Sequence, residues 1–290
     1  MRKTEYYQPG MPDPVLEDGF VIEVVRQYVK DAKKVVSIDD SHGEARTYNV
    51  DDRVILKVQR PHRLRSSTSL HKEAFFLQHL AGHTDVSVPR VYGYEKRSTL
   101  EYICMSKMRG VAADHVKLSV CEKNCLLLVL GKELRKIHDA DQTPLLNSGL
   151  FPADEPRDLA ERIRQRYLNV FDTARSKSTP ELREAWMNDM DDALNTIHDP
   201  DSFRALHANP YTPHVFIDEK TKTYNGIIDF GDAYIGHPVF DMWYWKVASR
   251  ETLLKGYSSE KPVSASFLTV FNTLNRISRK SDDLKLGLSS

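Results

Sequence analysis

The stretch LHANPYTPHVFIDEKTKTYNGIIDFGDAYIGHPVFD, from Leu206 to Asp241, decides how the rest of this chain is interpreted. Its pattern predicts a turn, a short strand over Val215 to Asp218, a polar turn and a second strand over Asn225 to Asp229. A loop rich in glycine and aspartate follows. Asp229 stands at the end of an apolar strand, which is a usual position for a metal ligand at the mouth of a cleft. We therefore predict that Asp229 binds a metal ion.

The stretch resembles the catalytic and metal-binding region of the aminoglycoside phosphotransferase family, small-molecule kinases with a protein-kinase-like fold. That family carries a His-x-Asp-x-x-x-x-Asn loop, two short strands and then Ile-Asp-Phe/Trp-Gly-Asp. Here Ile228-Asp229-Phe230-Gly231-Asp232 matches the last part. In the loop, His207 is present, but Asn209 replaces the catalytic aspartate and His214 replaces the asparagine. The loop of macrolide phosphotransferases also ends in His, so the resemblance implies that His214 and Asp229 hold the metal.

Asn209 changes the expected chemistry. Phosphoryl transfer depends mainly on positioning and charge neutralisation, and a carboxylate near the acceptor hydroxyl takes its proton. The amide of Asn209 orients a hydroxyl but does not accept its proton in the same way. Three interpretations stay open: a slow kinase, a natural pseudokinase, or a chain in which an aspartate was deliberately replaced. We expect His207, the other catalytic-loop candidate, to support the loop by hydrogen bonding.

Upstream of this region, a lysine interrupts an apolar strand, Val54-Ile55-Leu56-Lys57-Val58. Lys57 either faces solvent or reaches a phosphate. The next predicted helix, over Leu70 to Leu80, carries Glu73. The order matches the family, which implies that Lys57 pairs with Glu73 and aligns the α/β-phosphates; otherwise the two form a surface ion pair of little energetic value.

Two further segments are candidates for nucleotide contacts. The turn Ser41-His42-Gly43-Glu44 precedes a predicted strand over Ala45 to Val50, and Gly43 either helps to cover the phosphates or belongs to an ordinary hairpin. Strands over Val88 to Tyr94 and Thr99 to Met105 complete a five-stranded antiparallel sheet. The stretch Met105 to Gly110 resembles the family's hinge, whose backbone contacts the adenine edge, and this places Ser106 and Met108 at the nucleotide.

The second half of the chain is predominantly helical in pattern. A long helix from Val120 ends near His138, where the helix dipole favours a cation. Residues 150–202 form a predicted helical insert, with helices over 158–171 and 180–197. Its acidic residues form either a solvated face or a wall that attracts a cationic substrate: Glu181, Glu184, Asp189, Asp191, Asp192, Asp199 and Asp201. Neighbouring arginines weaken the second interpretation: Arg157, Arg162, Arg164 and Arg166. Asp241 matches the family's structural aspartate.

Composition narrows the class of protein. A chain of 290 residues with 40% hydrophobic content forms one large core or two lobes around a cleft. The net charge of +0 gives no reason to expect a nucleic-acid or membrane partner. The three cysteines lack metal-binding spacing and are expected to be reduced. No apolar leader follows Met1, so we expect a soluble, cytoplasmic protein.

These observations predict an α+β, two-lobed, protein-kinase-like fold. Residues 1–106 form the N-lobe, an antiparallel sheet plus helix, and residues 107–290 form the mostly helical C-lobe. The expected function is transfer of the γ-phosphoryl of ATP or GTP, with Mg²⁺, to a hydroxyl of an antibiotic-like or metabolite substrate, slowed or inactivated by Asn209. Such an antibiotic kinase would act in antibiotic resistance, as a monomer or weak dimer. The alternatives are a pseudokinase that binds nucleotide or ligand without transfer, and a kinase fold reused for non-kinase chemistry.

Overall fold

The computed structural model describes residues 15–39, 43–63, 65, 68–97, 100–154, 158–174, 179–197 and 203–286. They fall into two compact units. The bounds of the first are Met1–Glu122, Asp139–Pro152 and His207–Ala233, and those of the second are Lys123–His138, Ala153–Leu206 and Tyr234–Ser290. The predicted α+β class is confirmed by a sheet and helices in the first unit and by mainly helical structure in the second. The lobe boundary after residue 106 stays a prediction.

The first unit contains the predicted five-stranded antiparallel sheet, with strand order β1-β2-β3-β5-β4. Its strands are β1 (Val35–Asp39), β2 (Ala45–Val50), β3 (Val54–Gln59), β4 (Val91–Lys96) and β5 (Glu101–Ser106). The β2–β3 turn has positive φ at Asp51 (52°) and Asp52 (56°), the backbone geometry that suits the twist of a tight hairpin. Strand β4 begins later than predicted, after Pro89, whose missing N–H suits a position outside a ladder.

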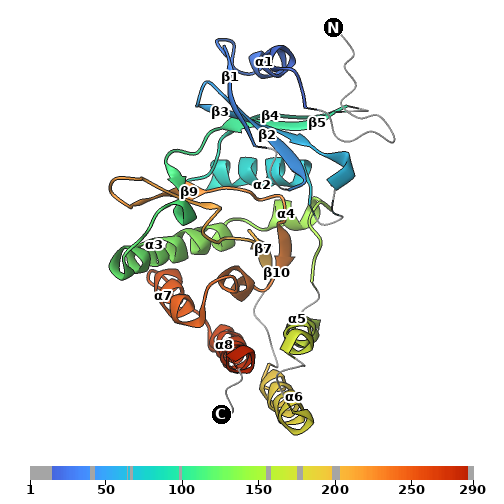
Figure 1. Ribbon diagram of the computed structural model, residues 1–290, viewed down its shortest axis with the longest axis vertical. Coiled ribbons are helices and arrows are strands. Elements are labelled where there is room, and N and C mark those ends of the chain that lie inside the picture. Colours follow the sequence, from blue (N-terminus) through green and yellow to red (C-terminus); the bar gives the residue numbers. More distant parts are fainter. Residues whose placement is uncertain are drawn as a thin grey trace. The chain divides into compact units, whose positions relative to one another are not determined.

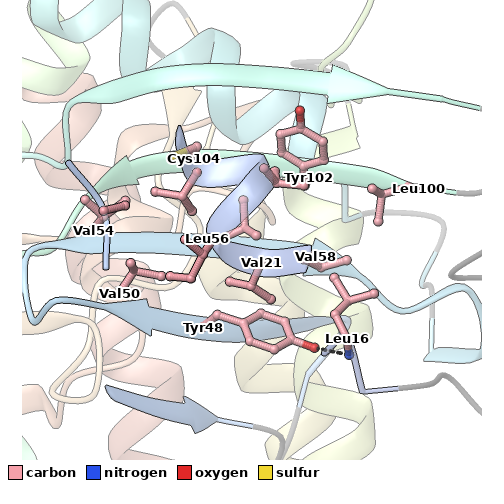
Figure 2. Packing of buried hydrophobic residues seen from close by; sticks show 14 residues of the cluster. Leu16, Val21, Tyr48, Val50, Val54, Leu56, Val58, Leu100, Tyr102 and Cys104 are labelled. Carbon is pink, nitrogen blue, oxygen red and sulfur yellow. Dashed lines mark hydrogen bonds between the residues drawn. The ribbon is translucent and has the colours of Figure 1, made fainter. Parts of the chain in front are cut away.

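The two faces of this sheet are covered by different helices. Successive side chains of a strand point to opposite faces, so Leu56 and Lys57 in β3 face opposite ways. Helix α1 (Asp18–Arg26) covers the face of Leu56, and Figure 2 shows the apolar cluster between them, with the Leu16 N–H donating to the Tyr48 hydroxyl at 2.8 Å. Helix α2 (Leu70–His83) covers the other face (Figure 1), which therefore receives Lys57.

Helix α2 begins at a capped N-terminus. The Oγ of Ser69 accepts a hydrogen bond from the Lys72 N–H at 3.3 Å, which satisfies one of the otherwise unpaired donors of the first turn. Glu73 lies in that first turn, where a carboxylate also suits the helix dipole. The position of the helix start therefore determines which part of the sheet the Glu73 side chain faces.

A smaller antiparallel sheet completes the first unit. Its order is β6-β8-β9, formed by β6 (Val111–Ala112), β8 (Val215–Ile217) and β9 (Tyr224–Ile227). The prediction contained the last two strands but not β6, because a two-residue strand has no periodicity. Gly110 precedes β6 with φ of 84°, and a Cβ there would lie 2.1 Å from the Ile217 carbonyl oxygen. This position therefore requires glycine. The unit also contains η1 (Pro61–Arg63), η2 (Ala113–His115) and α4 (Thr143–Asn147).

The second unit is mostly helical. Its elements are α3 (Val120–Asp139), which begins in the first unit, α5 (Leu159–Ala174), α6 (Pro180–Leu194), β7 (Arg204–Leu206), β10 (Tyr234–Gly236), η5 (Pro238–Met242), α7 (Val247–Tyr257) and α8 (Ala265–Leu286). The turn predicted before Val215 is present at residues 212–214, whereas Leu206, where the predicted stretch begins, ends β7 and pairs with Tyr234 of β10. That pairing joins segments that are distant in sequence, so no local sequence pattern predicts it.

His138 lies in the last turn of α3, as predicted, and its side chain is buried. Its Nδ1 lies 3.1 Å from the Tyr257 hydroxyl and its Nε2 lies 3.0 Å from a carboxylate oxygen of the buried Asp241. His138 and Asp241 therefore belong to an internal polar network of the second unit, in keeping with a structural role for Asp241.

Ion pairs neutralise part of the acidic surface of the insert. Asp191 pairs with Arg164, and Asp189 pairs with Arg276 of α8. Asp199, Asp201 and Arg157 of the predicted charge pattern lie outside the described residues. These ion pairs favour a solvated, internally paired helix face over a wall kept free for a cationic substrate.

Two simpler expectations concern the cysteines and membrane segments. Cys104 is buried and Cys121 and Cys125 are exposed, and all three carry free thiols. No helix in the described part of the chain is long and apolar enough to cross a lipid bilayer.

Candidate active site

One lysine joins three segments of the first unit. The Nζ of Lys57 on β3 lies 3.0 Å from both carboxylate oxygens of Glu73 on α2, and 2.7 Å from Oδ1 of Asp229 in the loop after β9. The Glu73 side chain is 1% exposed and that of Lys57 15%, whereas that of Asp229 is 40% exposed. The sequence-predicted pair is thus formed, and Lys57 also reaches the predicted metal ligand.

The charges of this group depend on one another. Burial disfavours the ammonium of Lys57, but the carboxylates of Asp229 and Glu73 outweigh it and raise the lysine pKa. Burial raises the pKa of Glu73, and Lys57 opposes that shift. Burial also acts on Asp229, but Lys57 and then His214 hold its pKa well below the usual range. Asp229 is therefore the carboxylate kept ionised, as a metal ligand must be.

The loop that presents Asp229 is held in an uncommon conformation. Asp229 has φ of 72°, in the left-handed region that costs non-glycine residues free energy. The Ile228 N–H donates to the His214 carbonyl at 3.0 Å, and the Ser69 N–H donates to the Gly231 carbonyl at 3.3 Å. The Phe230 ring packs edge-on against Phe76 of α2, with centroids 5.2 Å apart. Contacts on both sides of Asp229 thus maintain its backbone geometry.

His207 supports the loop that precedes β8. Its Nε2 lies 2.8 Å from the Ile228 carbonyl oxygen, so Nε2 carries the proton and donates. Its Nδ1 then accepts a hydrogen bond from the Asn209 N–H at 3.2 Å. The side chain is fully buried, and its ring centroid lies 4.4 Å from that of Phe230. Both ring nitrogens are used for structure, which agrees with the supporting role expected of this residue.

The side chain of Asn209 has an unused acceptor. Its Oδ1 is buried and has no hydrogen-bond partner among the described residues. Its backbone carbonyl, in contrast, accepts from the Tyr211 N–H at 3.0 Å and from Nδ1 of His214 at 2.8 Å. A buried polar atom without a partner is costly, so this oxygen is an acceptor that the described residues leave unused.

His214 faces Asp229 with its second ring nitrogen. Because Nδ1 of His214 donates to a carbonyl oxygen, the neutral ring has its lone pair on Nε2. That Nε2 lies 3.2 Å from Oδ2 of Asp229. The pair either forms an ion pair with a charged imidazole or shares a cation between nitrogen and oxygen. The donor set fits a metal ion, and the predicted ligands His214 and Asp229 are adjacent.

The protein supplies only part of a coordination sphere there. Among the described residues, no group of three or more His, Cys, Asp or Glu side chains is arranged to hold a metal ion. An ion bound by His214 and Asp229 therefore needs further ligands of another kind. Magnesium sites of this kind take them from substrate phosphates and water.

The predicted hinge uses part of its backbone hydrogen-bonding groups within the first unit. The Ser106 N–H donates to the Arg90 carbonyl at 2.8 Å, and the Lys107 N–H donates to the Arg53 carbonyl at 2.9 Å. Ser106 Oγ also accepts from the Arg90 N–H at 2.8 Å. Met108, by comparison, makes no backbone hydrogen bond within the described part of the chain. The contact of Met108 with the edge of a base stays a prediction.

The other predicted nucleotide contact, Gly43, precedes β2. It has φ of 90°, and a Cβ added there would meet nothing within 4 Å, so the turn is open on that side. Ser41 and His42 of the same predicted turn lie outside the described residues.

The structure adds residues that the sequence did not single out. Asp232 lies in the recognised motif, but its partners Arg65 and Thr68 come from the connection between β3 and α2. The one sequence signal in the connection between β3 and α2 was its number of basic residues. Such a composition is equally typical of a solvated loop.

The chain resembles known proteins both in its sequence profile and in its fold. A sequence profile of the phosphotransferase enzyme family (APH) matches residues 36–258. Macrolide 2'-phosphotransferase MphH from Brachybacterium faecium superposes with a TM-score of 0.63 at 18% identity, over 92% of this chain and 91% of that one. ADP-bound aminoglycoside phosphotransferase APH(2'')-Ib gives 0.61 at 16% identity, over 92% and 90%.

The streptomycin–ATP complex of APH(2")-IIa is similar as well, with a TM-score of 0.60 at 17% identity over 94% of each chain. No curated protein sequence matches. At these identities the superpositions establish the kinase-like fold, and the profile match establishes the family. The chain belongs to the phosphotransferase enzyme family.

Proposed function

We propose that this protein binds a purine nucleoside triphosphate with a divalent cation and transfers its γ-phosphoryl group to a hydroxyl of a small molecule, slowly because of Asn209. The observation that carries the proposal is the position of Lys57, whose ammonium lies within 3.0 Å of Glu73 and 2.7 Å of Asp229. A lysine held by a buried glutamate beside a metal-binding aspartate is the arrangement that aligns phosphates in kinase-like folds.

Each part of the nucleotide has a candidate partner. The N–H and C=O of Met108 suit the base, and Lys57 suits the α/β-phosphates. His214 and Asp229 would hold the cation, which supplies charge neutralisation at the transferred group. Three similar structures contain ATP, ADP or GDP, which supports a nucleotide site and leaves the choice of base to experiment.

The acceptor is proposed to be a small molecule with a hydroxyl group. Similar structures hold kanamycin, streptomycin or gentamicin, which supports a small-molecule acceptor of the antibiotic-like or metabolite kind. The buried, unpartnered Oδ1 of Asn209 would accept a hydrogen bond from the attacking hydroxyl. It orients that oxygen but leaves its proton without a strong base.

Nucleotide binding provides the first test, because it requires no knowledge of the acceptor. We expect ATP or GTP to raise the unfolding temperature in a magnesium-dependent way, since a ligand that binds only the folded state stabilises it by RT ln(1 + [L]/Kd). The measurement is a thermal-shift titration with each nucleotide, with and without magnesium. Absence of a shift with both nucleotides would make the kinase proposal untenable while leaving the fold unaffected.

The choice of cation gives a second expectation. Magnesium prefers oxygen ligands, whereas manganese accepts an imidazole nitrogen more readily. We therefore expect Mn²⁺ to support nucleotide binding better than Mg²⁺, and His214→Asn to reduce this preference by about tenfold. Nucleotide affinity in each metal, measured by calorimetry, checks it.

The matched control for that experiment is His115→Asn, at an exposed histidine on η2. It is expected to leave the Mn²⁺/Mg²⁺ affinity ratio unchanged. An equal ratio in the wild type and in His214→Asn would remove His214 from the coordination sphere.

A nucleotide-binding pseudokinase is the second candidate, favoured by Asn209 itself. It predicts the same metal-dependent nucleotide binding without turnover. Nucleotide hydrolysis or transfer to an accepted hydroxyl, at any rate above that of an Asp229→Asn control, excludes it.

A further inference from the structure

Asp232 lies three residues after the proposed metal ligand and has several polar partners. The Nη2 of Arg65 lies 3.1 Å from both carboxylate oxygens of Asp232, and Thr68 Oγ1 donates to Oδ1 at 2.5 Å. The buried Lys72 of α2 is also close; burial lowers its pKa to about 8, and the charge of Asp232 opposes that shift. Asp232 is thus fixed by the connection between β3 and α2.

Arg65 also binds a second segment. Its Nε pairs with a carboxylate oxygen of Glu44, immediately after Gly43 at the start of β2. The backbone of Glu44 is anchored too, since its carbonyl accepts from the Arg60 N–H at 2.7 Å and from the Gln59 side-chain amide at 2.7 Å. One guanidinium therefore ties the turn before β2 to the loop after β9. We refer to Arg65, Glu44 and Asp232 as the Arg65 bridge.

The bridge complements the lysine contact described above. Lys57 holds the loop at Asp229, and Arg65 holds it at Asp232, so two cations fix the two ends of one short turn. The strained φ of Asp229 lies at one of these ends. A planar guanidinium offers several N–H donors in fixed directions, so it contacts both carboxylates with a defined geometry.

We propose that Arg65 is a positioning residue for the metal–nucleotide site: it couples the turn before β2 to the loop that carries Asp229, acting through Glu44 and Asp232 rather than through contact with the nucleotide. This inference rests on the proposed function for the identity of the ligand. The coupling itself is a property of the ligand-free protein. Loss of Arg65 frees both segments together and weakens binding of the metal–nucleotide complex.

The experiment compares Arg65→Ala and Arg65→Lys with Arg63→Ala, an exposed arginine two positions earlier whose side chain makes no hydrogen bond or ion pair within the described residues. Hydrogen exchange of the ligand-free proteins is measured in peptides covering residues 43–50 and 228–234. Affinity for ATP and GTP is measured with and without magnesium. Arg65→Ala is expected to speed exchange in both segments and to weaken magnesium–nucleotide binding by about fivefold, because exposed ion pairs couple sites modestly. For Arg65→Lys, the exchange rates and the affinity are expected to lie between those of the wild type and those of Arg65→Ala. Arg63→Ala is expected to match the wild type.

Double-mutant comparisons with Glu44→Gln and Asp232→Asn separate positioning from direct contact. If Arg65 acts through these carboxylates, Arg65→Ala adds little to the affinity loss of either variant. Fully additive losses would show that Arg65 contacts the nucleotide itself and would overturn the proposal. Exchange rates equal to those of Arg63→Ala in either segment would overturn it as well. Faster exchange in both segments of a protein that binds neither nucleotide would support the coupling and refute the proposed function instead.

Discussion

Replacing Asn209 with aspartate is expected to raise the rate of phosphoryl transfer by about 10²- to 10⁴-fold, the range that a positioned general base contributes. The change is nearly isosteric, so the loop held by His207 keeps its shape. The carboxylate would occupy the position of an oxygen that is buried and unpartnered in the present chain. It would orient the acceptor hydroxyl and also receive its proton.

The measurement is turnover of ATP or GTP against a panel of hydroxyl-bearing antibiotics and metabolites, for the wild type, Asn209→Asp and Asn209→Ala. The residue after Asn209 is Pro210, which lacks the backbone N–H that attacks an asparagine side chain during spontaneous deamidation. Any activity of the unmodified chain therefore belongs to the asparagine form. Equal rates for Asn209→Asp and Asn209→Ala on every accepted substrate would contradict the role assigned to this position.

Replacing Asp229 with alanine is expected to abolish magnesium-dependent nucleotide binding. The low pKa of Asp229 keeps its carboxylate ionised, and with His214 it supplies the protein's part of the metal site. No group of three or more His, Cys, Asp or Glu side chains in the described residues is arranged to take over. The change also releases Lys57, whose ammonium then interacts with Glu73 alone. We expect the magnesium-dependent part of the affinity to disappear, and any binding that remains to be independent of metal.

Calorimetric titration with and without magnesium checks this expectation. Asp229→Asn serves as a second variant, because it keeps the size of the side chain if the alanine form does not fold. Asp114→Ala, at a carboxylate of η2 outside the proposed site, is the matched control and is expected to bind like the wild type. Magnesium-dependent binding retained by both Asp229 variants would refute the metal assignment.

Local sequence patterns account for much of the first unit. The apolar run around Lys57 and the amphipathic stretch over Leu70 to Leu80 predicted a strand and a helix, and both are present. The resemblance implied the Lys57–Glu73 pair, which the structure contains. The motif around Asp229 predicted its place after a strand. These features were accessible because an apolar run, helical periodicity and a short motif each depend on neighbouring residues.

Other features depend on pairing between distant segments. Strands β6, β7 and β10 have two or three residues each and exist only through partners elsewhere in the chain. His138 has the pattern of a helix end, yet its partners Asp241 and Tyr257 lie more than 100 residues away in sequence. Burial of a polar group depends on what surrounds it, and a short window of sequence does not contain that information.

By itself, the sequence determined the fold class, the five-stranded sheet and helix α2 of the first unit, and the residue types available for phosphate and metal binding. Only the tertiary structure decided how those residues are used. It assigned the proton of His214 by setting Asn209's carbonyl 2.8 Å from Nδ1, left Oδ1 of Asn209 without a partner, and joined Glu44 to Asp232 through Arg65. The physical reason is that residue types and local periodicity are properties of the chain, whereas proton positions, ion pairs and unpaired groups are properties of distances between segments that folding alone brings together.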